Sequence, residues 1–159
     1  MTMLFKRHFQ TAYVVDDIQQ AMAVFASNYG ITQWDVMDMV AMAGPGQPLM
    51  FIANAWAGDM MIELMQPDEN VTSIYTGWQK QSGAQFRLHH LGFLVDSVAQ
   101  MAEHKQQLVR NGCAIVSEGS FGEVLDFAYA DTTSELDHFY ELIHLKSGGK
   151  AFFDRIPVN

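Results

Sequence analysis

The sequence is short of cysteine and of basic residues, and each shortage excludes a class of protein. Cys113 is the single cysteine, so the chain cannot form an internal disulfide. Nine lysines and arginines face eighteen acidic residues, which gives a formal net charge of -9. A nucleic-acid backbone requires a basic surface, and this composition offers none. We therefore expect no nucleic-acid partner.

Long apolar runs are also missing. No stretch approaches the roughly 20 apolar residues that cross a bilayer. The first ten residues, MTMLFKRHFQ, lack the apolar core and small-residue cleavage site of a signal peptide. These absences predict a cytoplasmic protein with no membrane partner.

The residues that are present describe a globular chain. Its 159 residues are 49% hydrophobic and 17% charged, which is typical of a folded domain rather than a disordered segment. This length suits one compact domain built of two related halves. Eleven methionines either fill irregular gaps in the core or line a flexible apolar ligand pocket.

The sequence contains an internal repeat of one structural unit. Residues 9–30 and 90–112 each begin with a β-forming stretch, meet a polar break and continue with apolar positions at helical spacing. The breaks carry capping-box signatures that start at Asp17 and Ser97, 80 positions apart, with glutamine as the fourth residue of each. Gly30 and Gly112 then stop the helices. The repeat length is about half the chain.

Strand-like segments follow each predicted helix. The predicted strands are residues 34–42, 49–55 and 60–66 in the first half, and 114–117, 124–131 and 138–144 in the second. Each half is therefore a βαβββ module, and the fold class is α+β. We predict a single domain of modules 8–66 and 88–145, with a linker at 67–87 and an irregular tail at 146–159. A short helical turn is expected near residues 74–79 of the linker.

Two glutamates occupy equivalent places in the last strands of the modules. MMIELMQ and HFYELIH align Glu63 with Glu141. A carboxylate in an apolar strand is costly unless it is paired, hydrogen-bonded or bound to a metal. Because side chains alternate along a strand, Met61 and Met65 share the face of Glu63, and Phe139 and Ile143 share that of Glu141. We predict that both glutamates face a shared cavity, with these four apolar residues as substrate-pocket candidates.

Two adjacent histidines open the predicted strand RLHHLGFLV. His89 and His90 must point to opposite faces, so one of them faces the cavity. The repeat favours His90, whose counterpart 80 positions earlier is Gln10. Gln10, Glu63, His90 and Glu141 together offer one imidazole nitrogen, two carboxylates and an amide oxygen. This donor set suits a divalent ion such as Mn²⁺, Co²⁺, Ni²⁺, Zn²⁺ or Mg²⁺.

The paired modules, HHLGFLVD and FYELIH resemble the vicinal-oxygen-chelate superfamily, also called glyoxalase/bleomycin-resistance/dioxygenase proteins. The resemblance covers roughly residues 9–145, and ELMQP and HHLGF are most similar to the branch that contains methylmalonyl-CoA epimerase. It implies a cup-shaped mixed sheet, a homodimer, and one metal ligand from the first and the last strand of each module. Those places are Gln10, Glu63, His90 and Glu141.

One position departs from the family pattern. Family enzymes commonly carry a histidine where this chain has Gln10, and glutamine is a neutral, weaker ligand. His8 is the alternative ligand, because a shift of two residues preserves the facing of a strand side chain. The spacing to the following cap favours Gln10, since it equals the spacing from His90 to Ser97.

Three functions compete. The leading one is a metal-dependent lyase or isomerase that transfers a proton next to a carbonyl of a small, partly hydrophobic substrate, with Glu63 or Glu141 as the catalytic base. The resemblance implies glyoxalase-type isomerisation or epimerisation of an acyl-CoA thioester. The alternatives are a non-catalytic protein that binds or sequesters a small molecule, and an Fe(II) ring-cleaving dioxygenase, which would need His8 as a second histidine.

Overall fold

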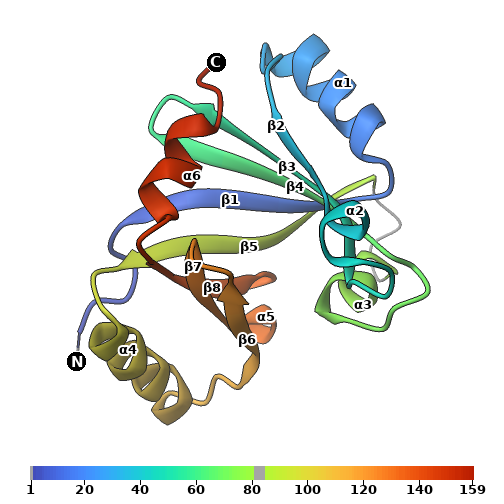
Figure 1. Cartoon of the computed structure of the whole chain (residues 1–159). Coiled ribbons are helices and arrows are strands. Elements are labelled where there is room, and N and C mark those ends of the chain that lie inside the picture. Colours follow the sequence, from blue (N-terminus) through green and yellow to red (C-terminus); the bar gives the residue numbers. More distant parts are fainter. Residues whose placement is uncertain (1, 81–84) are drawn as a thin grey trace. The chain divides into compact units, whose positions relative to one another are not determined.

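The computed structural model describes residues 2–80 and 85–159 and contains both predicted βαβββ modules (Figure 1). The first module consists of β1 (His8–Val15), α1 (Ile18–Tyr29), β2 (Asp35–Asp38), β3 (Leu49–Ala57) and β4 (Met60–Pro67). The second consists of β5 (Phe86–Val95), α4 (Val98–Arg110), β6 (Ile115–Phe121), β7 (Leu125–Ala130) and β8 (Phe139–Leu145). Shorter helices are α2 (Met39–Ala43), α3 (Ile74–Lys80), α5 (Thr133–Leu136) and α6 (Gly149–Arg155). The α+β class and the repeated module are confirmed.

The chain forms two compact units whose boundaries differ from those of the modules. Unit 1 joins the residues up to Gln10 with His90–Arg155, and unit 2 joins Thr11–His89 with Ile156–Asn159. The strand order is β1-β5-β8-β7-β6 in unit 1 and β2-β3-β4-β1 in unit 2. Strands β1 and β5 therefore each contribute residues to both units.

The two predicted helix caps are present. The Asp17 side chain accepts a hydrogen bond from the Gln20 amide at 2.9 Å, and Gly30 ends α1 with φ 75. At α4, Ser97 accepts from the Gln100 amide at 3.1 Å. These side chains satisfy backbone N–H groups that have no partner within the helix. They fix where each helix leaves its first strand.

The helix of each module covers one face of its sheet. In unit 2, Ile18 and Ala21 of α1 pack with Val15, Ala53 and Leu64. In unit 1, α4 covers the alternate residues of the central strands. Its cluster consists of Phe93, Val95, Met101, Leu108, Ala128, Ala130, Tyr140 and Leu142. Because side chains alternate, the residues between these on β5, β7 and β8 point to the opposite face.

Three segments differ from the sequence prediction. The strand predicted through residue 42 stops at Asp38, whose side chain accepts from the Ala41 amide and caps α2. The predicted loop after β7 contains α5. The tail expected to be irregular contains α6. The linker does hold the expected helix, α3, and its residues 81–84 lie outside the described part of the chain.

Candidate functional site

His90 and Glu141 form a buried pair on the face opposite α4 in unit 1. The His90 Nε2 lies 3.0 Å from the Glu141 Oε2, and the two residues are 0% and 5% exposed. Strands β5 and β8 run parallel, and their register sets His90 beside Phe139 and Gly92 beside Glu141. The Tyr129 ring meets the His90 ring edge-on, with centroids 5.1 Å apart. The predicted proximity of His90 and Glu141 is present.

Both histidines of the HH pair are buried. His89 is 0% exposed and stacks on Tyr75 of α3, with ring centroids 4.8 Å apart. His90 takes the opposite face, as the alternation of side chains requires. Neither histidine is therefore an exposed strand-end residue.

Gln10 extends the site across Gly92. Gln10 is 3% exposed, and its buried Oε1 has no hydrogen-bond partner among residues 2–80 and 85–159. A Cβ atom added at Gly92 would lie 2.5 Å from that Oε1 and 2.9 Å from the Gln10 Cβ. The Gln10 side chain therefore lies directly on the bare backbone of β5, at the residue that is in register with Glu141.

His8 occupies a different environment. Its side chain is exposed, its Nε2 lies 2.9 Å from the main-chain oxygen of Gln10, and its ring centroid lies 5.2 Å from that of Phe93. Phe93 belongs to the cluster on the α4 face, opposite His90. This geometry favours Gln10 over His8 as a partner of the His90–Glu141 pair.

Glu63 belongs to unit 2. It is half-buried on β4 in register with Asn54 of β3. Asn54 is 1% exposed, and its Oδ1 has no hydrogen-bond partner in the part of the chain that the structure describes. Met61 and Met65, on the same face of β4 as Glu63, are buried, as Phe139 and Ile143 beside Glu141 are in unit 1. The pocket role predicted for these four residues stays a prediction.

The model of one protein family matches most of this chain. The Glyoxalase/Bleomycin resistance protein/Dioxygenase superfamily matches residues 9–129, which include β1 from Phe9 onward, the His90 segment and Tyr129. The chain belongs to this superfamily. Among proteins of curated function, no significant match is found.

Several solved structures resemble the chain at low sequence identity. A hypothetical protein from Bacillus halodurans C-125 is 18% identical over 89% of this chain and 95% of its own, with TM-score 0.65. Methylmalonyl-CoA epimerase from Mycobacterium tuberculosis is 15% identical over 95% of both chains, with TM-score 0.65. A Streptomyces coelicolor methylmalonyl-CoA epimerase variant in complex with 2-nitronate-propionyl-CoA is 13% identical over 89% and 95%, with TM-score 0.64. At these identities the likeness shows the fold alone.

The donors in unit 1 of this superfamily member fit a divalent cation. Gln10, His90 and Glu141 offer an amide oxygen, an imidazole nitrogen and a carboxylate, a mixture that first-row divalent ions accept. Within residues 2–80 and 85–159, no three His, Cys, Asp or Glu side chains group as a metal site. The amide is therefore the third donor that unit 1 supplies. Its buried, unpartnered oxygen is the observation that supports the fit.

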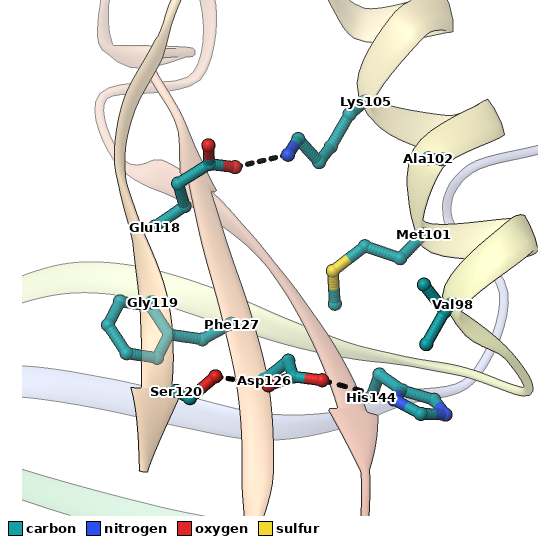
Figure 2. A pocket seen from close by; sticks show the side chains of 10 residues that line it. All are labelled: Val98, Met101, Ala102, Lys105, Glu118, Gly119, Ser120, Asp126, Phe127 and His144. Atoms are coloured by element: carbon teal, nitrogen blue, oxygen red, sulfur yellow. Dashed lines mark hydrogen bonds and ion pairs between the residues drawn. The ribbon is translucent and has the colours of Figure 1, made fainter.

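A groove that was not predicted from the sequence lies on the α4 side of unit 1. This groove, of about 380 Å³, lies between α4 and strands β6 to β8 (Figure 2). Asp126 on its wall accepts from the Ser120 hydroxyl and lies 3.5 Å from His144. The Ser120 hydrogen bond is the largest cause of a lowered pKa of Asp126; burial opposes it, and His144 and Lys146 add to it. On β8, His144 faces away from Glu141, as alternation predicts.

The burial of His104 on α4 was also not predicted from the sequence. Helical spacing alone places His104 on the polar side of α4, whereas it is 6% exposed and neither ring nitrogen has a hydrogen-bond partner in the described structure. Among the described helices, none is both long enough and apolar enough to cross a membrane.

Proposed function

We propose that this superfamily member is a metal-dependent lyase or isomerase that moves a proton next to a carbonyl. The observation that carries the proposal is the buried His90–Glu141 pair with the Gln10 amide oxygen beside it, which has no hydrogen-bond partner among the described residues. An unpaired polar group inside a protein costs roughly 1–3 kcal/mol. A cost of this kind at a site of mixed donors is typical of function rather than of packing.

The residues of the chain have distinct roles in this proposal. Gln10, His90 and Glu141 would hold a divalent ion, which when bound supplies a Lewis acid that polarises the substrate carbonyl. Glu141 is the proton-transferring group of unit 1, because a carboxylate can take a proton from carbon and return it. The same role, and a place in the ligand set, stay predictions for Glu63 of unit 2.

The apolar residues suggest the substrate class. Phe139 and Ile143 are 7% and 3% exposed on either side of Glu141 along β8. Such residues exclude water, which strengthens the electrostatic interactions of the reacting groups. We propose a small, partly hydrophobic carbonyl compound: a hemithioacetal, as for glyoxalases, or an acyl thioester, as the epimerase neighbours suggest.

The first experiment is to measure the metal content of the untagged protein by elemental mass spectrometry after dialysis against metal-free buffer. We expect near-stoichiometric Mn, Co, Ni or Zn. His90→Ala and Glu141→Ala should each lower metal affinity by about 100-fold or more, since ligands matter at least as much as the groups that orient them. Retention of full occupancy by both variants contradicts the proposed ligand set.

Two matched controls come from the same unit. His144→Ala removes a histidine three residues beyond Glu141 on β8, and Glu118→Ala removes a carboxylate on β6; both lie on the α4 groove. Neither should change metal affinity. Circular dichroism of all four variants separates loss of the ion from loss of the fold.

A non-catalytic binding protein is the second candidate, and the neutral Gln10 donor favours it. If the chain binds no ion when each is added back, a screen of hydrophobic small molecules replaces the enzyme assays. Bound iron would favour the dioxygenase, but the exposed His8, packed near Phe93, counts against it.

The homodimer stays a prediction. Light scattering tests it, because a dimer has twice the 17.9 kDa mass of one chain.

A further inference from the structure

Gly92 stands at the centre of a row of residues that crosses the sheet of unit 1. Its neighbour on β8 is Glu141, and Glu141 is in turn in register with Tyr129 of β7. On the other side, the Gln10 side chain lies against Gly92 itself. The row therefore reads Gln10, Gly92, Glu141 and Tyr129, with His90 two residues before the glycine on the same face of β5.

A side chain at Gly92 would remove Gln10 from this row. The Cβ of any other residue would lie 2.5 Å from the Gln10 Oε1 and 2.9 Å from its Cβ. A clash with the end of a flexible side chain alone could be relieved by a rotation. A clash with the Gln10 Cβ is different, because that atom is fixed to the backbone of β1 and cannot move without it.

The backbone of β5 does not itself demand glycine. Gly92 is not among the glycines with positive φ, so an L-residue could adopt its conformation. Glycine inside a strand weakens it, and its usual explanation is close approach of a ligand or of other protein atoms. Here the approaching group is the Gln10 amide.

We propose that Gly92 is a positioning residue that admits the Gln10 amide to the His90–Glu141 site, so that the site takes a neutral amide as a ligand of its divalent ion. This inference rests on the proposed function. The Gln10 Oε1 has no hydrogen bond within the described structure, so the amide can turn its oxygen toward an ion without breaking one. Amide oxygen and nitrogen exchange places by rotation about one bond.

The test is a double-mutant cycle of Gly92→Ala, Gln10→Ala and the two combined, read by Mn²⁺ affinity in calorimetry. Each single variant should weaken Mn²⁺ binding by about 10- to 100-fold. The combined variant should be no weaker than either single one, because both changes remove the same donor. Gly119→Ala is the matched control: it also adds a Cβ to a strand glycine, which would lie 3.1 Å from the Phe127 ring. Its Mn²⁺ affinity should equal that of the wild type.

Two further readouts separate positioning from mere packing. The visible spectrum of bound Co²⁺ responds to its ligands, so it should change in Gly92→Ala and in Gln10→Ala in the same way. In the metal-free protein, NMR should show a contact between the Gln10 β protons and the Gly92 α protons that Gly92→Ala abolishes. If Gly92→Ala does not fold, Gln10→Asn replaces it: the shorter amide makes no new clash, cannot extend across Gly92, and should weaken Mn²⁺ binding as Gln10→Ala does.

The outcomes distinguish this inference from the function on which it rests. Wild-type binding of Mn²⁺ that survives Gly92→Ala or Gln10→Asn unchanged overturns the positioning role and leaves the metal site standing. Losses that add in the combined variant overturn it as well. A wild-type chain that binds no divalent ion overturns both.

Discussion

Tyr140 shows how a single buried residue makes stability depend on pH. It is 1% exposed, its ring stacks on Phe93 with centroids 4.2 Å apart, and its hydroxyl donates to the Leu4 carbonyl at 2.5 Å. Burial raises the pKa of Tyr140 well above its ordinary value of 10.0. Between the two values the unfolded chain has lost the proton that the folded chain keeps, so stability falls as pH rises above about 10.

We predict that Tyr140→Phe removes this alkaline loss. At about pH 8 the variant should be less stable by about 1 kcal/mol, because the hydrogen bond to Leu4 is lost. Toward about pH 11 the wild type loses stability that the variant does not, so the gap between them should narrow. Urea midpoints across this range measure it. Tyr29→Phe, at a 68% exposed position, should follow the wild type throughout. A constant gap for Tyr140→Phe contradicts the prediction.

Some residues of the site could be predicted from the sequence, and others could not. Repetition and alternation together placed His90 and Glu141 on one face, because both depend only on backbone periodicity. The burial of His104 was missed, since helical spacing does not reveal what packs over a helix. Neither method could show that Gln10 lies over Gly92, which depends on how β1 meets β5 within unit 1.

At the scale of elements, residues 156–159 of unit 2 pair with the end of β3. The Trp56 amide donates to the Pro157 carbonyl at 2.9 Å, and Val158 bridges Trp56 in parallel. The Asn159 Oδ1 then accepts from the Thr32 and Gln33 amides at 2.8 and 2.9 Å. Its Nδ2 donates to the Gln33 carbonyl at 3.0 Å. One side chain thus fixes the connection between α1 and β2.

Asn159→Ala should loosen that connection without unfolding the chain. The hydrogen bonds are exposed, so we expect a loss of about 1 kcal/mol in the free energy of unfolding. Hydrogen exchange should accelerate at the Thr32 and Gln33 amides, which lose their acceptor. Asn28→Ala, on the exposed surface of α1, is the control and should leave these two amides protected. Unchanged exchange at both amides in Asn159→Ala would show that the backbone alone holds the connection.

The same cause explains why neither α2 nor α6 was predicted from the sequence. Around α2 the residues DVMDMVAMAG fit an alternating strand as well as a helix turn, and the Asp38 cap decides for the helix. The tail was expected to be irregular. Gly148 and Gly149 instead let the start of α6 approach the carbonyls of Glu123 and Val124, where an added Cβ would lie 3.0 and 2.8 Å away. In both cases a contact outside the local pattern settles the structure.

At the scale of the whole molecule, most of the scarce basic residues are already engaged. Within the described part of the chain, ion pairs with carboxylates are formed by Arg7, Lys105, Lys146 and Lys150. Two more lie over aromatic rings: Arg87 over Trp78, and Arg155 over Phe152. The net charge of -9 therefore weakens the binding of any substrate that carries several phosphates, because like charges repel.

This charge predicts an unusual salt effect if the substrate is a CoA thioester. Screening shortens the range of electrostatic forces from about 10 Å at 0.1 M salt to about 3 Å at 1 M. Raising NaCl from about 0.05 M to about 0.5 M should therefore tighten the binding of a CoA thioester, because it weakens repulsion between like charges. The matched pantetheine thioester, which lacks the nucleotide phosphates, should bind almost equally at both concentrations. Calorimetric titrations of the two compounds measure this difference. If salt instead weakens the binding of the CoA thioester alone, a local basic surface recognises its phosphates despite the charge of the whole chain. That result would favour an acyl-CoA thioester over a hemithioacetal as the substrate.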